Sequence, residues 1–366
     1  MPPTAGLSAT ASEQDRGADG SYCRSTPVTM AARSSMLDGE GDLSAGRSPR
    51  CFMHIPKSAG SSIHAALTAA LPPGSMASCR CDTSVFCVFD DFELLRPEAR
   101  ALVATNRDEV QALSRFRAVS GHFTLPTLLQ ITSASSVATI LREPRARLLS
   151  LYASWRTPSL TVFFAPYRAF DTAQCPLPEF LSKTQLALSI DNQLCRMLLD
   201  GDPRLPRTTF VAPGDVDAIA ATAIEKLDEL GCVGALELGQ AAWQGVAQLF
   251  GVRLDPVREN VTGHGVELAT VGSEACASSP EALSLLHQRV EADAIVYDYA
   301  LARMGVEEAA RRRLADDAFA QQQVRFDNLV GPSALRVARR RRRRLAISSK
   351  RALARLRRWL AARMPR

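Results

Sequence analysis

The sequence lacks any apolar run that approaches the roughly 20 residues of a membrane-spanning helix. Its N-terminus also lacks the apolar core of a signal peptide, and the acidic residues Glu13, Asp15 and Asp19 argue against a transit peptide. We therefore expect a soluble protein, cytoplasmic by default. A chain whose N-terminal anchor were missing would look the same, so a membrane-associated location such as the Golgi is the alternative.

The cysteines do not form a complete zinc-binding set. The chain has nine cysteines, and Cys79, Cys81 and Cys87 cluster in "CRCDTSVFC". This C-x-C-x5-C spacing provides no fourth ligand of the kind that structural zinc sites use. Ordinary thiols or one local disulfide are expected there, and a disulfide would favour an oxidising compartment.

Acidic residues are absent from the end of the chain. Residues 336–366 contain 14 Lys or Arg and no Asp or Glu, which leaves 30 basic and 38 acidic residues in the remainder. The net charge of +6 therefore combines a strongly basic tail with a body of net charge −8. The tail is either a solvated segment or a basic amphipathic helix that contacts a membrane surface, a nucleic acid or an anionic polysaccharide.

Composition divides the chain into three parts. Residues 1–49 are rich in Ser, Gly and Ala without sustained periodicity, so we expect this segment to be disordered. Residues 50–305 carry the patterns of a folded domain, in keeping with an apolar content of 46% and a charged content of 22%. Residues 306–366 are predicted to form an Arg-rich helical or disordered tail, broken at Gly331-Pro332.

Strands and helices alternate along the predicted domain. Strands are expected at "FMHI" (52–55), "RAVSGH" (117–122), "SVATILR" (136–142) and "TTFVA" (208–212). Helices are expected at 62–71, 143–155, 191–201 and 216–230, then, after "CVGALE" (232–237), in a segment up to Gly251 and at 281–304. This order predicts an α/β fold with a mostly parallel central sheet covered by helices on both faces.

The segment "HIPKSAGSSIHAAL" joins the first strand to the first helix and has the features of an anion-binding loop. The first-turn amides of a helix have no intrahelical acceptors, and the helix dipole favours negative charge there. Ala59 and Gly60 allow the backbone to approach a ligand closely, and Lys57 adds a cation. The hydroxyl donors of this loop are Ser58, Ser61 and Ser62.

The order of residues in this loop does not fit a nucleoside triphosphate. The P-loop motif places Lys after the glycines and follows it with the Ser or Thr that binds magnesium. Here Lys57 precedes Gly60, and the strand "VATIL" is followed by Arg142 instead of a metal-binding Asp. The loop therefore suits an anion that is held by hydrogen-bond donors without a divalent metal ion.

Two segments resemble the donor-binding elements of one enzyme family. "FMHIPKSAGSSIHAAL" is similar to the 5′-phosphosulfate loop of the carbohydrate sulfotransferases related to heparan sulfate 2-O-sulfotransferase. "VATILREPRARLLSLYASW" resembles their 3′-phosphate element, through Arg142, Glu143, Pro144, Arg147, Ser150 and Tyr152. Weaker similarities follow in the family's order: "SGHF" (120–123), "DNQLCRML" (191–198), "GCVGALELGQAAWQGVAQLFG" (231–251) and "RENVT" (258–262).

The resemblance implies a P-loop-like sulfotransferase fold and a specific reaction. The donor would be PAPS (3′-phosphoadenosine 5′-phosphosulfate), and the acceptor would be a hydroxyl group of a glycan. Lys57 with loop residues 58–62 would stabilise the leaving 5′-phosphate, while Arg142 and Ser150 would hold the 3′-phosphate. The alternative function is non-catalytic binding of an anion, glycan or nucleic acid through the basic tail.

The acceptor hydroxyl requires a base, for which His122 is the first candidate. It ends a predicted strand, where open parallel sheets place their chemistry, and the ordinary pKa of histidine suits proton removal near neutrality. The resembling enzymes carry a catalytic histidine in the matching segment. Glu143 is the alternative base, and His54 is expected to be structural. Four residues are further candidates for contact with the nucleotide or acceptor: Asn192, Arg196, Asn260 and Thr262.

Overall fold

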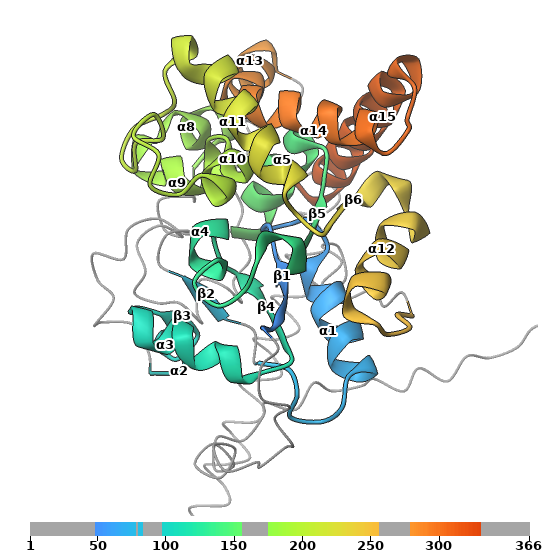
Figure 1. Cartoon of the computed structure of the whole chain (residues 1–366). Coiled ribbons are helices and arrows are strands. Elements are labelled where there is room, and N and C mark those ends of the chain that lie inside the picture. The colour runs from blue at the N-terminus through green and yellow to red at the C-terminus, as the bar shows by residue number, and fades with distance from the viewer. Residues whose placement is uncertain (1–47, 78–79, 83–96, 156–174, 256–278, 331–366) are drawn as a thin grey trace, which may run out of the picture. The chain divides into compact units, whose positions relative to one another are not determined.

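The computed structural model describes residues 48–77, 80–82, 97–155, 175–255 and 279–330 (Figure 1). Six strands form one sheet: β1 (Arg50–Met53), β2 (Arg80–Asp82), β3 (Val103–Ala104), β4 (Ala118–His122), β5 (Val137–Leu141) and β6 (Cys232–Ala235). All pairings are parallel, and the strand order is β3-β2-β4-β1-β5-β6. The predicted α/β class with a parallel sheet is therefore confirmed.

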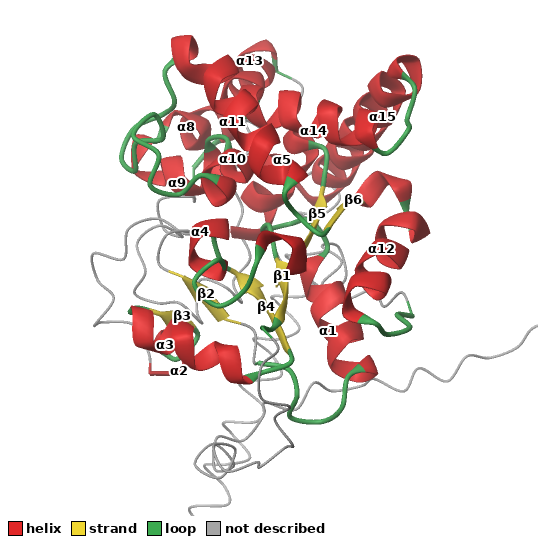
Figure 2. Cartoon of the chain, viewed as in Figure 1, coloured by secondary structure: helices red, strands yellow, loops and turns green. Residues whose placement is uncertain are grey.

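Helices flank this sheet (Figure 2). The first group is α1 (Gly60–Ala70), α2 (Pro97–Arg100), α3 (Arg107–Gln111), α4 (Leu125–Leu128), α5 (Pro144–Trp155), α8 (Leu177–Ser182) and α9 (Ala187–Ile190). The second is α10 (Gln193–Leu198), α11 (Val216–Asp228), α12 (Gln240–Phe250), α13 (Pro280–Arg289), α14 (Glu291–Arg303) and α15 (Glu308–Val330). No helix in the described part of the chain is both long and apolar enough to cross a membrane.

Alternating side chains of the central strands bury both faces of the sheet. On one face Phe52 of β1 packs in a cluster with Leu67 of α1 and Trp243 of α12. On the other face Met53 belongs to a cluster that includes residues of α10, α11 and α14, such as Ile219. Burial on both faces explains why β5 is an almost continuous apolar run instead of an alternating one.

β1 lies at the centre of the sheet and marks the point where the chain changes direction. From β1 the chain builds β2, β3 and β4 on one side and then crosses to β5 and β6 on the other. β1 is therefore hydrogen-bonded to both β4 and β5. Open α/β sheets bind their ligands outside the carboxyl ends of strands at such a switch point. The loop after β1, His122 at the end of β4 and Arg142 after β5 all lie at this edge.

A third apolar cluster surrounds α5 and includes the C-terminal helix. Tyr152 of α5, Phe180 of α8 and Phe326 of α15 are fully buried in it, and Phe319 of α15 is 7% exposed. The change of composition after Gly305 therefore does not mark the end of the packed core. At the other boundary, Pro49 is buried and its carbonyl oxygen accepts a 2.6 Å hydrogen bond from the Thr132 hydroxyl.

The strand predicted at 208–212 is wrong, because this segment has no regular secondary structure. Its polar backbone groups bond to side chains instead of to a neighbouring strand. The Val211 amide donates to Asp191 Oδ2 at 2.9 Å, and the Thr209 carbonyl accepts from Arg196 Nη2 at 3.2 Å. The Arg289 guanidinium lies over the ring of Phe210, with Cζ of Arg289 3.5 Å from the ring centroid.

The single helix predicted at 281–304 is also wrong, because it is divided at Val290 into α13 and α14. Asn192 stabilises the break from both sides. Its backbone N–H donates to the Arg289 carbonyl at 2.7 Å. Its side-chain Oδ1 accepts from the backbone amides of Ala292 and Asp293 at 2.9 and 3.3 Å. A capping side chain from a distant segment cannot be read from the local 3.6-residue period.

Several sequence predictions concern residues outside those that the structure describes. They are the disorder of residues 1–47, Cys79 and Cys87, "RENVT" with Asn260 and Thr262, and the basic tail 336–366. Smaller differences concern described residues. The first strand ends at Met53, earlier than expected, and the helix expected at 191–201 is confined to Gln193–Leu198.

Candidate active site

The loop between β1 and α1 has an unusual backbone conformation. Lys57 and Ala59 have left-handed φ angles of 70° and 60°, although neither is glycine. Such a conformation is unfavourable for residues with a Cβ and is maintained only where the surroundings impose it. Ala59 is the N-cap of α1 and provides no capping side chain. The first amides of α1 therefore receive no help from the side chain at the N-cap.

Arg142 connects this loop to the end of β5. Its Nη1 donates a 3.0 Å hydrogen bond to the carbonyl oxygen of Lys57, 85 residues earlier in the chain. Burial and the nearby charge of Arg142 lower the pKa of Lys57 to about 8. Burial also lowers the pKa of Arg142. Two cationic side chains thus lie side by side at the carboxyl edge of the sheet, in a position that an anion would stabilise.

The serines predicted to bind the donor lie in different environments. Ser58 is 1% exposed, and its hydroxyl has no hydrogen-bond partner among the described residues. Ser61 is partly buried and Ser62 is buried, both in the first turn of α1. Ser150 is buried on α5. The Ser58 hydroxyl, which has no hydrogen-bond partner among the described residues, could donate a hydrogen bond to an anionic ligand.

His122 lies on the opposite side of the loop from Arg142. Its Nδ1 is 2.7 Å from the His54 carbonyl oxygen, which can only accept, so Nδ1 carries the proton and the lone pair is on Nε2. Burial lowers the pKa of His122 to about 4, and the Lys57 charge contributes in the same direction. The side chain is therefore neutral at physiological pH and less basic than the sequence led us to expect.

His54 has a clear structural role beneath the loop. Its ring stacks on that of His122 with 4.0 Å between centroids, and burial lowers its pKa well below the ordinary value. The ring also lies directly against Gly60. A Cβ at position 60 would be 1.7 Å from His54 Cδ2, closer than any side chain can tolerate. Gly60 is thus required for packing against His54, in addition to the close approach to a ligand that we expected.

Glu143, the alternative base, is already occupied as a helix cap. Its Oε2 accepts the Ala146 amide at 2.6 Å, and its Oε1 accepts Arg145 Nε at 2.6 Å. Only 3% of this residue is exposed. A carboxylate that caps α5 and pairs with an arginine is poorly placed to take a proton from a substrate.

Asn192 and Arg196 do not reach the candidate site. Arg196 is 5% exposed and forms a buried ion pair with Asp191 at 2.5 Å. Asn192 has a left-handed φ of 45° and caps α14, as described above. In return, Asp293 accepts the amides of Leu194 and Cys195 at the start of α10. Asn192 and Asp293 therefore connect α10 to α14. The polar groups that make these hydrogen bonds are not available to a ligand.

Sequence reasoning assigned no role to Arg147, although the similarity motif contains it. Arg147 is 2% exposed, and its Nη1 donates to Gln193 Oε1 at 2.5 Å. Its Nε and Nη2 have no hydrogen-bond partner among the described residues, and burial lowers its pKa to about 10. The sequence already indicated that Arg147 lies near the candidate site, because it is on the same helix as Ser150, one turn earlier.

Glu237 was also missed, and it supports the backbone next to Arg142. Its Oε1 accepts the Glu143 amide at 3.0 Å, and its Oε2 accepts the Tyr297 hydroxyl at 2.8 Å. Its charge counteracts the lowering of the Arg142 pKa. Glu237 ends the segment "CVGALE". The sequence does not show that this segment lies next to β5, because that depends on the order of strands in the sheet.

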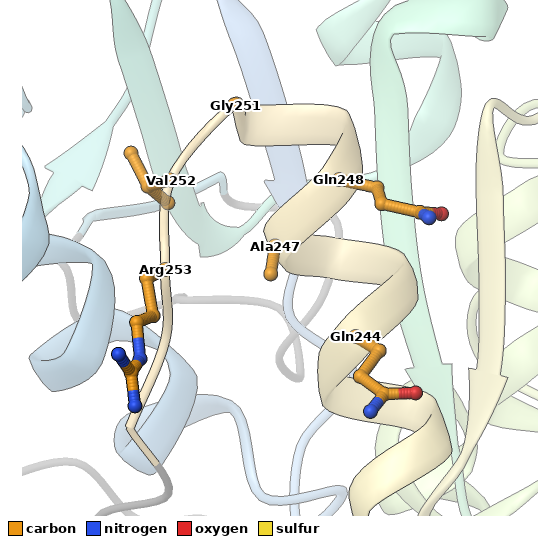
Figure 3. A pocket seen from close by; sticks show the side chains of 6 residues that line it. All are labelled: Gln244, Ala247, Gln248, Gly251, Val252 and Arg253. Carbon is orange, nitrogen blue, oxygen red and sulfur yellow. The ribbon is translucent and has the colours of Figure 1, made fainter.

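A pocket elsewhere on the molecule is distinct from this site (Figure 3). It is lined by Gln244, Ala247, Gln248, Gly251, Val252 and Arg253, at the end of α12. A Cβ at Gly251 would lie 3.1 Å from Nη1 of Arg50, the first residue of β1. The candidate site lies after the last residue of β1 instead.

Comparisons with known proteins do not assign a family. No protein-family model matches this chain, and no curated protein matches it either. Among the described residues, no group of three or more His, Cys, Asp and Glu side chains is arranged to hold a metal ion. The function therefore has to be inferred from the residues at the carboxyl edge of the sheet.

Proposed function

We propose that this protein is a sulfotransferase that moves a sulfuryl group from PAPS to a hydroxyl group of a carbohydrate. The observation that carries the proposal is the 3.0 Å hydrogen bond from Arg142 Nη1 to the Lys57 carbonyl. It joins the two segments that resemble the 5′-phosphosulfate and 3′-phosphate elements. The parallel order β4-β1-β5 supports the same conclusion, because it brings the ends of three strands together.

The residues present fit the donor's anionic groups. The amides of residues 59–61 and the unsatisfied Ser58 hydroxyl provide neutral hydrogen-bond donors, whereas the amides of Ser58 and Ser62 already donate to backbone carbonyls of the loop. Lys57 and Arg142 provide positive charge. The planar guanidinium of Arg142 can bind a phosphate through two parallel hydrogen bonds, so it is assigned to the 3′-phosphate. Ser150, buried on the helix that follows, is assigned to the same phosphate.

Lys57 has a role that depends on its lowered pKa. PAPS supplies the sulfuryl group, whose bond to the 5′-phosphate oxygen breaks as the bond to the acceptor oxygen forms. The oxygen left behind gains negative charge. In this proposal Lys57 stabilises that charge, and the charge in turn favours the protonated form of an amine whose pKa is otherwise about 8.

His122 is proposed as the base that takes the acceptor's proton. With Nδ1–H held by the His54 carbonyl, the proton would go to Nε2. The hydrogen bond to the His54 carbonyl also stabilises the imidazolium that results. Its low pKa means that the residue accepts a proton only as the acceptor oxygen becomes bonded to sulfur and much more acidic.

The direct test is transfer of labelled sulfate from PAPS to a panel of glycans, without added metal. Lys57→Ala should mainly lower kcat, because the lysine acts on charge that develops in the transition state. Arg142→Ala should mainly raise the KM for PAPS, because it removes a contact made throughout the reaction. Unchanged transfer in both variants would show that the proposed mechanism is wrong.

A further inference from the structure

The C-terminal helix α15 lies along α5, the helix that follows Arg142. Three of its residues contact α5, and a fourth contacts Arg142 just before α5. They lie along one stripe at intervals of three or four positions: Asp316, Phe319, Gln322 and Phe326. Asp316 pairs with Arg145 at 3.2 Å, and Phe319 lies 4.7 Å below the same guanidinium. Phe326 is fully buried with its ring 5.6 Å from that of Tyr152.

Gln322 contacts the candidate phosphate-binding arginine directly. Its Oε1 accepts a 2.8 Å hydrogen bond from Arg142 Nη2, and the residue is only 4% exposed. Arg142 therefore donates to two neutral oxygens, those of Lys57 and Gln322. It forms no ion pair with a described residue. Three of its five N–H groups remain for a ligand, and its charge is not neutralised by direct pairing.

Arg325 adds a second positive charge on the same helix. It follows Gln322 by three residues, so the two side chains lie on adjoining faces of one turn. Arg325 is exposed and forms no ion pair with a described residue. Burial is the main cause of the lowered pKa of Arg142, and the charge of Arg325 contributes in the same direction. Repulsion between two arginines is relieved when both contact one anion.

We propose that α15 forms one wall of the donor site, in which Gln322 is a positioning residue that orients Arg142 and Arg325 is a second cation for the 3′-phosphate. The inference rests on the proposed function, since that function assigns the 3′-phosphate to Arg142. It extends the site beyond the two segments in which the sequence similarity was found. The last helix of the described chain is then part of the binding machinery.

The test measures binding of adenosine 3′,5′-bisphosphate, the desulfated donor, and of AMP, which lacks the 3′-phosphate. Isothermal titration calorimetry on the full chain gives both affinities. Arg325→Gln should weaken binding of the bisphosphate about tenfold and leave AMP binding unchanged, because only the bisphosphate carries the 3′-phosphate. A tenfold change corresponds to about 1.4 kcal/mol. Arg313→Gln, on the same helix and also exposed, is the matched control and should change neither affinity.

Gln322→Glu provides a second test with an isosteric change. The new carboxylate would pair with Arg142 and compete with the phosphate, so bisphosphate affinity should fall by a factor of ten or more. The melting temperature should stay equal or rise, which a merely structural defect would not produce. Gln321→Glu makes the same charge change at an exposed neighbour and should have little effect.

The outcomes separate the inference from the proposed function. If the unaltered chain binds the bisphosphate more tightly than AMP, and Arg325→Gln and Gln322→Glu leave that preference intact, α15 is not part of the site. The proposed function then stands. If the unaltered chain does not bind the bisphosphate, the proposed function fails and the inference fails with it. Selective loss in both variants, with both controls unaffected, supports the inference.

Discussion

The ring of His54 stacks on the ring of His122 at a centroid separation of 4.0 Å, while the His54 carbonyl accepts the Nδ1 proton of His122 at 2.7 Å. One residue thus determines both the orientation and the tautomer of the proposed base. The stack lies beneath the loop that carries Lys57. Burial lowers the pKa of both histidines, and the charge of Lys57 contributes in the same direction. The neutral pair and the cationic lysine form one electrostatic unit.

The pH dependence of kcat/KM should reflect this unit. His122 must be neutral to accept a proton, so activity should fall as the pH decreases through about 4. Lys57 must be protonated, so activity should fall as the pH rises above about 8. Lys57→Arg should shift the alkaline limb to higher pH, because a guanidinium keeps its charge. An acid limb near 6.5 would contradict the burial of His122.

Lys57→Met should increase stability while it lowers turnover. A lysine whose folded pKa is about 8 and whose unfolded pKa is near 10.5 destabilises the fold below pH 8. Removing it should therefore raise the free energy of unfolding by about 1–3 kcal/mol at pH 7. The gain should shrink as the pH rises from 8 to 10.5. Denaturant unfolding at pH 7 and pH 10 checks this, and equal effects at both pH values would disprove it.

Gly60→Ala should destabilise the protein by about 1–3 kcal/mol, the usual cost of overpacking a core. The added Cβ would collide with the buried ring of His54. Gly214→Ala is the matched control, because no atom lies within 4 Å of its added Cβ. If the collision is the cause, Gly60→Ala should cost less in a His54→Ala background. A purely additive double-mutant cycle would rule out this explanation.

Asn192→Ala should lower stability without changing the KM for PAPS. The change removes the cap of α14, worth about 1 kcal/mol, and places a Cβ-bearing residue without local hydrogen bonds at a φ of 45°. Asn192→Gly also loses the cap but tolerates the left-handed conformation, so it should cost about 1 kcal/mol less. A raised KM with unchanged stability would instead assign Asn192 to the ligand.

Local sequence patterns predicted the main elements because those elements depend on neighbours in the chain. The strands at 117–122 and 136–142 are present within one residue of the expected bounds. The helix expected at 216–230 is also confirmed, as α11 over Val216–Asp228. The failures at 208–212 and at Val290 share one cause. In both places, side chains from distant segments satisfy backbone groups that a local pattern assigns to a strand or a helix.

The sequence by itself determined the chemical character of the loop at Lys57 and the likeness of two segments to donor-binding elements. Both depend on residue types at fixed spacing, which the chain preserves in any conformation. Only the tertiary structure decided which distant groups meet there. It brought Gln322 to Arg142, the ring of His54 to Gly60, and Glu237 to the start of α5. These contacts depend on strand order and helix packing, for which burial of the apolar faces of the whole chain is responsible.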